Sequence, residues 1–237
     1  MKFFAIVVAL VVILGCKKTT SQTMNDLNSS DFTVKGDGSY LAIGDSYTIG
    51  EAVKLESNFP YQLAAVVKGS GFDLGKPYII AKTGWTTSEL QAGIRAAGLT
   101  QKFKIVTLLI GVNNQYRGEA ITTYRAEFKA LLQTAIDFAD GQVKHVFVVS
   151  IPDWGLTPYG HTSGRSQQTI STEIDAFNAV NKEETLARGV SYTDITPQSR
   201  LAATDPDLNA SDGLHPSAKM YAGWVSALSP SVIKSLK

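Results

Sequence analysis

The sequence has one cysteine and three histidines among its 237 residues, and both scarcities limit its chemistry. Cys16 has no second cysteine to pair with, so no internal disulfide can form. No group of cysteines and histidines shows the spacing of a zinc site. A mechanism that needs an imidazole can draw only on His145, His161 or His215.

The sequence also lacks an excess of charge of either sign. It holds 22 Lys and Arg against 21 Asp and Glu, for a formal net charge of +1, without an arginine-rich run. Proteins that bind nucleic acids concentrate positive charge on one surface or segment. We therefore expect no nucleic-acid partner. The length and ordinary composition fit one domain with a sizeable core.

One long uncharged run is present, at residues 3–15, and it reads FFAIVVALVVILG. Thirteen residues are too few to span a bilayer comfortably and are typical of a signal peptide. The end of the run, VILGC, resembles a bacterial lipoprotein box, although Ile13 stands where leucine is more usual. We expect residues 1–16 to be a lipoprotein signal peptide with Cys16 lipidated. The alternative is an ordinary secretory signal with a cysteine there by chance.

The segment that follows, residues 17–39, is polar and without periodicity, so we interpret it as a tether. It would hold the domain at residues 40–237 clear of a membrane. These features predict an exported protein of the cell envelope, anchored to a membrane by its N-terminal lipid. The sequence leaves open which membrane and which face. We expect a monomer.

Strand-like and helix-like stretches alternate through the rest of the chain. The strand-like stretches are residues 40–43, 77–81, 103–111, 145–152 and 190–193. The helix-like stretches are residues 60–67, 86–98 and 119–140, a helix with Ile170, Ile174 and Phe177 that ends near Gly189, and a terminal helix with Tyr221, Trp224, Val225 and Leu228. This alternation predicts a parallel sheet covered on both faces. Such sheets bind ligands beyond the carboxyl ends of their strands.

Four loops follow strands, and three of them carry a potential nucleophile, a side-chain amide, or an acid and a histidine. The four loops read GDSYTIG (44–50), AKTGWTTSEL (81–90), GVNNQ (111–115) and ASDGLHPSAKM (210–220). Taken singly, each has a plainer interpretation. A Gly-Asp-Ser turn is more often a helix cap, GVNN is a turn, and DGLHP is a loop with a histidine before a proline.

Taken together, the four loops resemble the SGNH (GDSL-type) hydrolase family, over nearly all of residues 40–228. GDSYTIG is similar to the nucleophile block with Ser46, TGWTT to the glycine block with Gly84, and GVNN to the block with Asn113. DGLHP is similar to the block that carries the acid and the histidine, here Asp212 and His215. The resemblance implies a three-layer α/β/α sandwich with a central parallel five-stranded sheet of the flavodoxin-like kind.

The resemblance also implies a serine hydrolase with a Ser46–His215–Asp212 triad. A serine hydroxyl is a poor nucleophile until a base removes its proton. His215 alone has an acid at the proper offset, and that carboxylate would fix the tautomer of the imidazole. The backbone N–H groups of Ser46 and Gly84 and the side-chain amide of Asn113 would form the oxyanion hole.

Two positions bear on this assignment. Thr48 occupies the second glycine position of G-x-S-x-G, which argues against the α/β-hydrolase elbow. Asn114 stands where the family often has aspartate, and this departure concerns the packing of the loop more than the activity.

Other polar and aromatic residues have structural interpretations. We expect His145 to be structural, His161 to be a solvated loop residue with substrate contact as the alternative, and Asp45 to brace the turn. Three aromatic residues could line an acyl or sugar pocket or simply pack: Trp85, Tyr116 and Trp154.

We therefore predict hydrolysis of carboxylic esters through an acyl-enzyme, with no metal or organic cofactor. The expected substrates are small-molecule, lipid or glycan esters, as in lysophospholipases and acylesterases. With no obvious lid, a small or single-chain acyl ester is favoured over a triglyceride. The alternatives are a carbohydrate acetylesterase or an acyltransferase of the same fold, and a catalytically silent lipoprotein that binds a glycan or lipid.

Overall fold

The computed structural model describes residues 33, 34, 36 and 38–237. The signal peptide, the lipidation site Cys16 and most of the tether lie outside these residues, so they stay predictions of the sequence. Within the described part, no helix combines the length and the apolar character needed to cross a membrane.

A mixed sheet of six strands forms the centre of the molecule, in the order β1-β3-β2-β4-β5-β6. The strands are β1 Thr33–Val34, β2 Tyr40–Asp45, β3 Tyr78–Lys82, β4 Ile105–Leu109, β5 Val146–Val149 and β6 Ser191–Thr193. β2 to β6 are parallel, as predicted, and β1 pairs antiparallel with β3 at the edge. β1 was not predicted, because it has only two residues and lies in the segment interpreted as a tether.

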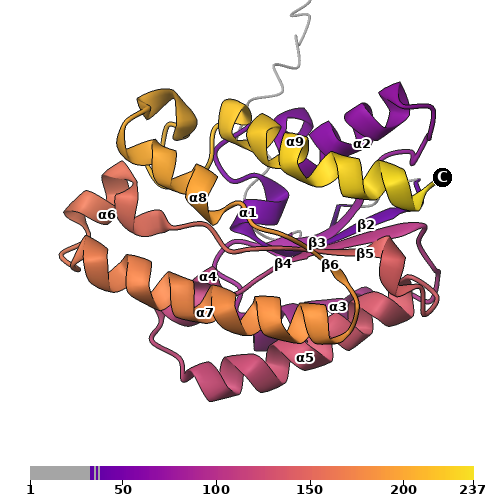
Figure 1. Cartoon of the computed structure of the whole chain (residues 1–237), viewed down its shortest axis with the longest axis horizontal. Coiled ribbons are helices and arrows are strands. Elements are labelled where there is room, and N and C mark those ends of the chain that lie inside the picture. The colour runs from indigo at the N-terminus through magenta and orange to yellow at the C-terminus, as the bar shows by residue number, and fades with distance from the viewer. Residues whose placement is uncertain (1–32, 35, 37) are drawn as a thin grey trace, which may run out of the picture.

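Helices cover both faces of the sheet and make three layers, which confirms the predicted α/β/α sandwich (Figure 1). α2 (Phe59–Gly69) and α9 (Ala218–Ser235) pack together on one face. α3 (Thr87–Ala97), α5 (Ile121–Phe138) and α7 (Gln167–Ala187) lie on the other face.

The strands are apolar along their whole length because both of their faces are buried. Leu41 and Ile43 in β2 and Val106 and Leu108 in β4 are all fully buried. The covering helices instead bury one stripe, which in α5 includes Tyr124, Phe128, Leu131, Leu132 and Ala135. Continuously apolar strands and helices with one apolar stripe therefore form the three layers that the sequence predicted.

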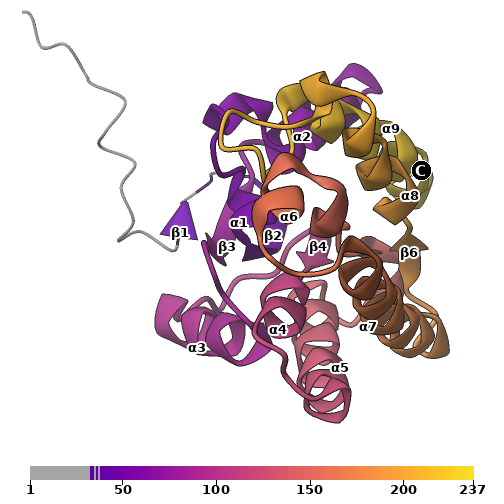
Figure 2. The same cartoon turned by 90° about the vertical axis from the view of Figure 1, so that its left-hand side faces the viewer.

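Four short helices follow parallel strands at their carboxyl ends, and the sequence did not indicate them. They are α1 (Ser46–Ile49), α4 (Val112–Tyr116), α6 (Pro158–Thr162) and α8 (Thr196–Ser199). One turn of helix is too short to show a hydrophobic period. Figure 2 looks onto this end of the sheet, with α1, α4 and α6 facing the viewer.

The strand order reverses between β2 and β4, which is where such sheets bind ligands. Gly44 makes the close packing at this point possible. A Cβ atom there would lie 2.1 Å from Thr48 Oγ1 and 2.3 Å from the Leu109 carbonyl oxygen. A glycine therefore allows α1 to fold back over the junction of the two strands.

Candidate active site

Ser46 is the first residue of α1 and sits directly at the carboxyl end of β2. Asp45 is the N-cap of this helix, and its Oδ1 accepts a hydrogen bond of 3.0 Å from the backbone N–H of Tyr47. Gly50 ends the helix with a left-handed φ of 80°. A single capped turn of helix therefore holds Ser46 at the carboxyl end of β2, where the residue is buried.

Asp212 and His215 lie in a tight turn before α9. Asp212 Oδ1 accepts hydrogen bonds from the backbone N–H groups of Leu214 and His215, each 3.0 Å long. Its Oδ2 lies 2.6 Å from His215 Nδ1. The three-residue offset thus brings one carboxylate to both the backbone and the ring.

The other ring nitrogen, His215 Nε2, lies 2.9 Å from Ser46 Oγ. Burial raises the pKa of Asp212, but hydrogen bonds from the His215 ring and from the backbone N–H groups of His215 and Leu214 outweigh it and lower this pKa to about 2. An ionised carboxylate only accepts hydrogen bonds, so Nδ1 donates to it. Nε2 is then the acceptor for the Ser46 hydroxyl.

Gly84 and Asn113 come from the segments that follow β3 and β4. The Asn113 side-chain amide donates to the Trp85 carbonyl oxygen at 3.0 Å and to Asp45 Oδ2 at 3.4 Å. Gly84 has a φ of 83°, and a Cβ atom there would meet only Arg117 Nη2, at 3.8 Å. Glycine is therefore favoured here by the left-handed backbone conformation. There is room for a Cβ atom, so steric crowding is not the reason.

Arg117 ties the Gly84 loop to the end of α4, a contact for which the sequence held no signal. Its Nη2 donates to the Gly84 carbonyl oxygen at 2.6 Å, and its Nη1 pairs with Glu89 Oε1 at 3.2 Å. These contacts form because a loop and the end of a helix lie close together in the folded protein. The positions of Arg117 and Gly84 in the sequence do not predict this.

Asn114 is fully buried, and its side chain makes hydrogen bonds within the protein. Its amide nitrogen donates to Thr87 Oγ1 at 2.7 Å and to Glu119 Oε2 at 2.8 Å. Its amide oxygen accepts from the Thr87 backbone N–H at 3.1 Å. The amide therefore satisfies three partners and joins α4 to the start of α3.

Asp45 is a fully buried carboxyl group beside the serine. Burial raises its pKa to about 7, although hydrogen bonds from the Tyr47 backbone and the Asn113 side chain act in the opposite direction. The expectation that Asp45 braces the turn agrees with its contacts.

A cavity of about 220 Å³ opens beside Ser46 and His215. Its walls are Ser46, Tyr47, Thr83, Gly84, Val112, Asn113, Tyr116, Trp154, Tyr159, Leu214 and His215. Four of the five site residues expected from the sequence therefore face one space. The fifth, Asp212, lies behind His215.

Two of the three aromatic residues expected at a pocket line this cavity, Tyr116 and Trp154. The Trp85 ring instead packs over Gly93 of α3, where an added Cβ would lie 2.1 Å from it. Tyr159 lines the cavity without any sequence signal, because α6 has no detectable period.

The two remaining histidines lie elsewhere. His161 is exposed on α6 and is not part of the cavity wall. His145 Nε2 lies 3.3 Å from the Ser235 carbonyl oxygen, near the end of α9, which agrees with a structural role. Among the described residues, no group of three His, Cys, Asp or Glu side chains could hold a metal ion.

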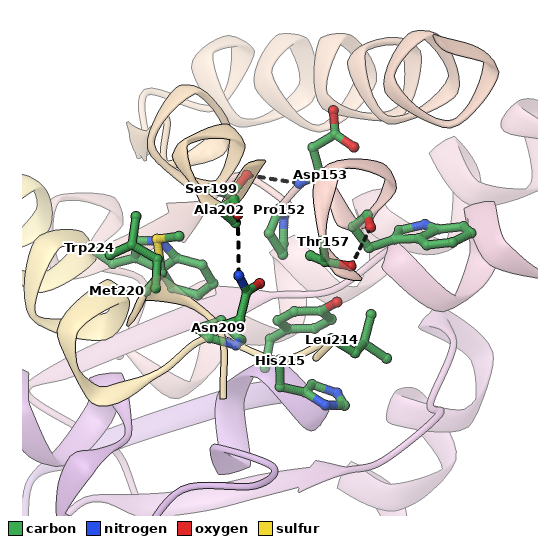
Figure 3. A pocket seen from close by; sticks show the side chains of 14 residues that line it. Pro152, Asp153, Thr157, Ser199, Ala202, Asn209, Leu214, His215, Met220 and Trp224 are labelled. Atoms are coloured by element: carbon green, nitrogen blue, oxygen red, sulfur yellow. Dashed lines mark hydrogen bonds between the residues drawn. The ribbon is translucent and has the colours of Figure 1, made fainter. Parts of the chain in front are cut away.

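A second, much smaller cavity shares Leu214 and His215 with the first in its wall (Figure 3). Its volume is about 10 Å³, close to the least that holds one water molecule. Hydrogen bonds brace its wall, from the Asp153 backbone N–H to Ser199 Oγ at 2.9 Å and from Asn209 Nδ2 to the Ala202 carbonyl oxygen at 3.3 Å. This space is too small for a substrate, so the larger cavity is the candidate site.

Several solved structures share this fold. A lipase/acylhydrolase from Enterococcus faecalis is 18% identical, with a TM-score of 0.65, over 82% of this chain and 95% of that chain. TesA is 16% identical, with a TM-score of 0.64, over 83% and 98%. Axe2, an acetylxylan esterase from Geobacillus stearothermophilus, is 16% identical, with a TM-score of 0.60, over 86% and 95%. Comparison with curated proteins finds no significant match.

At such low identities the solved structures establish the fold alone. The family is established by the sequence itself, because the model of the GDSL-like Lipase/Acylhydrolase family matches residues 42–222, which is most of the chain. The chain therefore belongs to the GDSL-like lipase/acylhydrolase family.

Proposed function

We propose that this chain is a serine esterase that cleaves small carboxylic esters through an acyl-enzyme on Ser46. The observation that carries the proposal is the contact of 2.9 Å between Ser46 Oγ and His215 Nε2 at the wall of an open cavity. A nucleophile within reach of a base that is itself oriented by a third group is the arrangement that activates a serine.

In the first half of the reaction, Ser46 Oγ attacks the ester carbonyl carbon while its proton moves to His215 Nε2. Asp212 stays ionised and stabilises the imidazolium that forms. His215 then gives this proton to the oxygen of the leaving alcohol. The ester C–O bond breaks, and the acyl group remains on Ser46.

The negative charge that develops on the carbonyl oxygen needs donors that are already in place. We assign this role to the backbone N–H groups of Ser46 and Gly84 and to the Asn113 amide. The longer of the two Asn113 contacts, at 3.4 Å to Asp45, is the one that the oxyanion replaces. Loss of one such donor typically costs about 3 kcal/mol of transition-state stabilisation.

In the second half, water replaces the alcohol. His215 takes a proton from the water as it attacks the acyl carbon, and returns it to Ser46 Oγ as the acid leaves. An acceptor hydroxyl in place of water would give acyl transfer instead. The intact contact from Ser46 to His215 argues against a silent binding protein, which would not need it.

The cavity favours a small acyl group. Its volume of about 220 Å³ is below the range of roughly 300–1,000 Å³ that is usual for sites of drug-sized ligands. One structure of the same fold is an acetylxylan esterase, and another is a lipase/acylhydrolase. We therefore place short acyl esters, including acetyl esters of carbohydrates, before long-chain lipids.

Ser46→Ala tests the proposal. With p-nitrophenyl acetate, we expect the variant to lose at least about a thousandfold in kcat while its circular dichroism spectrum stays that of the wild type. Ser70→Ala removes an exposed hydroxyl at the end of α2 and is the matched control, with wild-type activity. Turnover by Ser46→Ala within tenfold of the wild type would show that the assignment is wrong.

A further inference from the structure

Aromatic rings from two different loops line one part of the large cavity. The Tyr116 ring, from α4, lies 5.3 Å from the Trp154 ring, and the Tyr159 ring, from α6, lies 6.0 Å from it on centroids. The hydroxyl groups of Tyr116 and Tyr159 are 2.9 Å apart and share a hydrogen bond. The segments that follow β4 and β5 therefore meet at this part of the cavity.

Trp154 is the fixed part of this wall. It is 1% exposed, and its Nε1 donates a hydrogen bond of 2.7 Å to Gln115 Oε1. The Arg165 guanidinium lies 5.5 Å from the ring centroid. Contacts on several sides thus hold the indole in one position.

The two tyrosines form the outer part of the wall. Tyr116 is 48% exposed and Tyr159 is 36% exposed, so both face solvent as well as the cavity. Because water competes for exposed hydroxyl groups, their hydrogen bond alone contributes little to this wall. The two rings pack against Trp154, so the rings rather than the hydroxyl groups form the bulk of this part of the wall.

We propose that Tyr116 and Tyr159 set the length of the acyl group by closing the cavity at this aromatic wall. The inference rests on the proposed esterase function. The wall there is made of aromatic rings, so it receives the apolar arm of the ester. In an ester of a polar alcohol, such as a sugar or glycerol phosphate, the apolar arm is the acyl chain. A chain that extends past Trp154 meets the two tyrosine rings.

The test is the chain-length preference of the full-length protein on the acetate, butyrate and octanoate monoesters of glycerol, whose alcohol is polar. We expect the wild type to prefer the short esters. In Tyr116→Ala and in Tyr159→Ala, the ratio of kcat/KM for octanoate to kcat/KM for acetate should rise at least tenfold. Tyr159→Phe keeps the ring and loses the hydroxyl, so its ratio should stay within threefold of the wild type.

A control variant and a second series of substrates complete the test. Leu186→Ala removes an exposed side chain on α7 outside the cavity wall and should keep the wild-type ratio. Acetate esters of alcohols of increasing length should show no new preference in the alanine variants. A new preference there would place the alcohol at this wall and overturn the inference.

Unchanged chain-length ratios in both alanine variants, with normal hydrolysis of acetate, would overturn this inference and leave the esterase function intact. A wild-type protein that hydrolyses none of the esters would overturn the esterase function itself, and this inference with it.

Discussion

Asp45 is a fully buried carboxyl group beside Ser46, and its burial changes its pKa. It caps the helix that carries Ser46 and lies within 3.4 Å of the Asn113 amide, yet its side chain is cut off from water. Its pKa is raised by burial from 3.8 to about 7. Between pH 3.8 and about pH 7, the Asp45 carboxyl keeps its proton in the folded protein but has lost it in the unfolded chain. The free energy of unfolding therefore falls as the pH rises through this range.

Asp45→Asn should remove this pH dependence. Between pH 5 and pH 7 the wild type should lose about 2 kcal/mol in its free energy of unfolding through Asp45. The variant should lack this decrease, because asparagine does not titrate and caps a helix as well as aspartate. Urea unfolding at both pH values measures the difference between the two proteins. An equal decrease in both would show that Asp45 is already ionised at pH 5.

The sequence singled out Ser46, Gly84, Asn113, Asp212 and His215 as candidates because each stands in a short motif that resembles a block of the family. Arg117 and Tyr159 gave no such signal. Each contacts a residue from a different loop, with Arg117 on the Gly84 carbonyl oxygen and Tyr159 on the Tyr116 hydroxyl. Local motifs therefore predict candidates for the proposed reacting centre, but they do not predict contacts between loops such as those of Arg117 and Tyr159.

At the scale of elements, the one-turn helices connect the sheet to the site. α1 presents Ser46 and α4 presents Asn113 at the junction of β2 and β4. The Gly84 loop reaches them from β3, and Arg117 at the end of α4 fastens it. The two exposed ion-pair partners of this link add little to stability, typically about 0–1 kcal/mol. Its effect should be on geometry.

Arg117→Met should therefore separate activity from stability. We expect kcat on acetate esters to fall about tenfold, equivalent to ~1.4 kcal/mol, because the Gly84 loop loses its hydrogen bond to Arg117 beside the proposed oxyanion hole. The free energy of unfolding should change by less than about 1 kcal/mol. Arg125→Met breaks the contacts of Arg125 with Glu183 and Glu184, away from the site, and is the matched control. Equal losses of kcat in both variants would contradict this role for Arg117.

At the scale of the whole molecule, the fold brings together residues from opposite ends of the domain. Ser46 and His215 are 169 positions apart in the sequence. α9 follows His215 and packs on α2, and the Tyr221 hydroxyl of α9 donates to the Tyr47 carbonyl oxygen at 3.1 Å. The helix that closes the sandwich thus also holds the His215 loop against α1.

The layers could be predicted because strands buried on both faces and helices buried on one differ in hydrophobic period. The edge strand β1 could not, because Thr33–Val34 is a pair of residues inside a polar segment. The cavity wall could be predicted only in part: Tyr116 and Trp154 were expected there, whereas Tyr159 was not, since the position of α6 depends on tertiary packing. The sequence therefore predicted where the site lies on the sheet but not the shape of its cavity.

The most direct test of the central claim is the reaction of the full-length protein with a fluorophosphonate, followed by mass spectrometry of the modified peptide. Only a serine activated by a base reacts rapidly with this reagent. We expect one adduct per chain, on Ser46, and a rate at least a hundredfold lower in His215→Ala. Modification at another residue, or equal rates in the wild type and His215→Ala, would contradict the account.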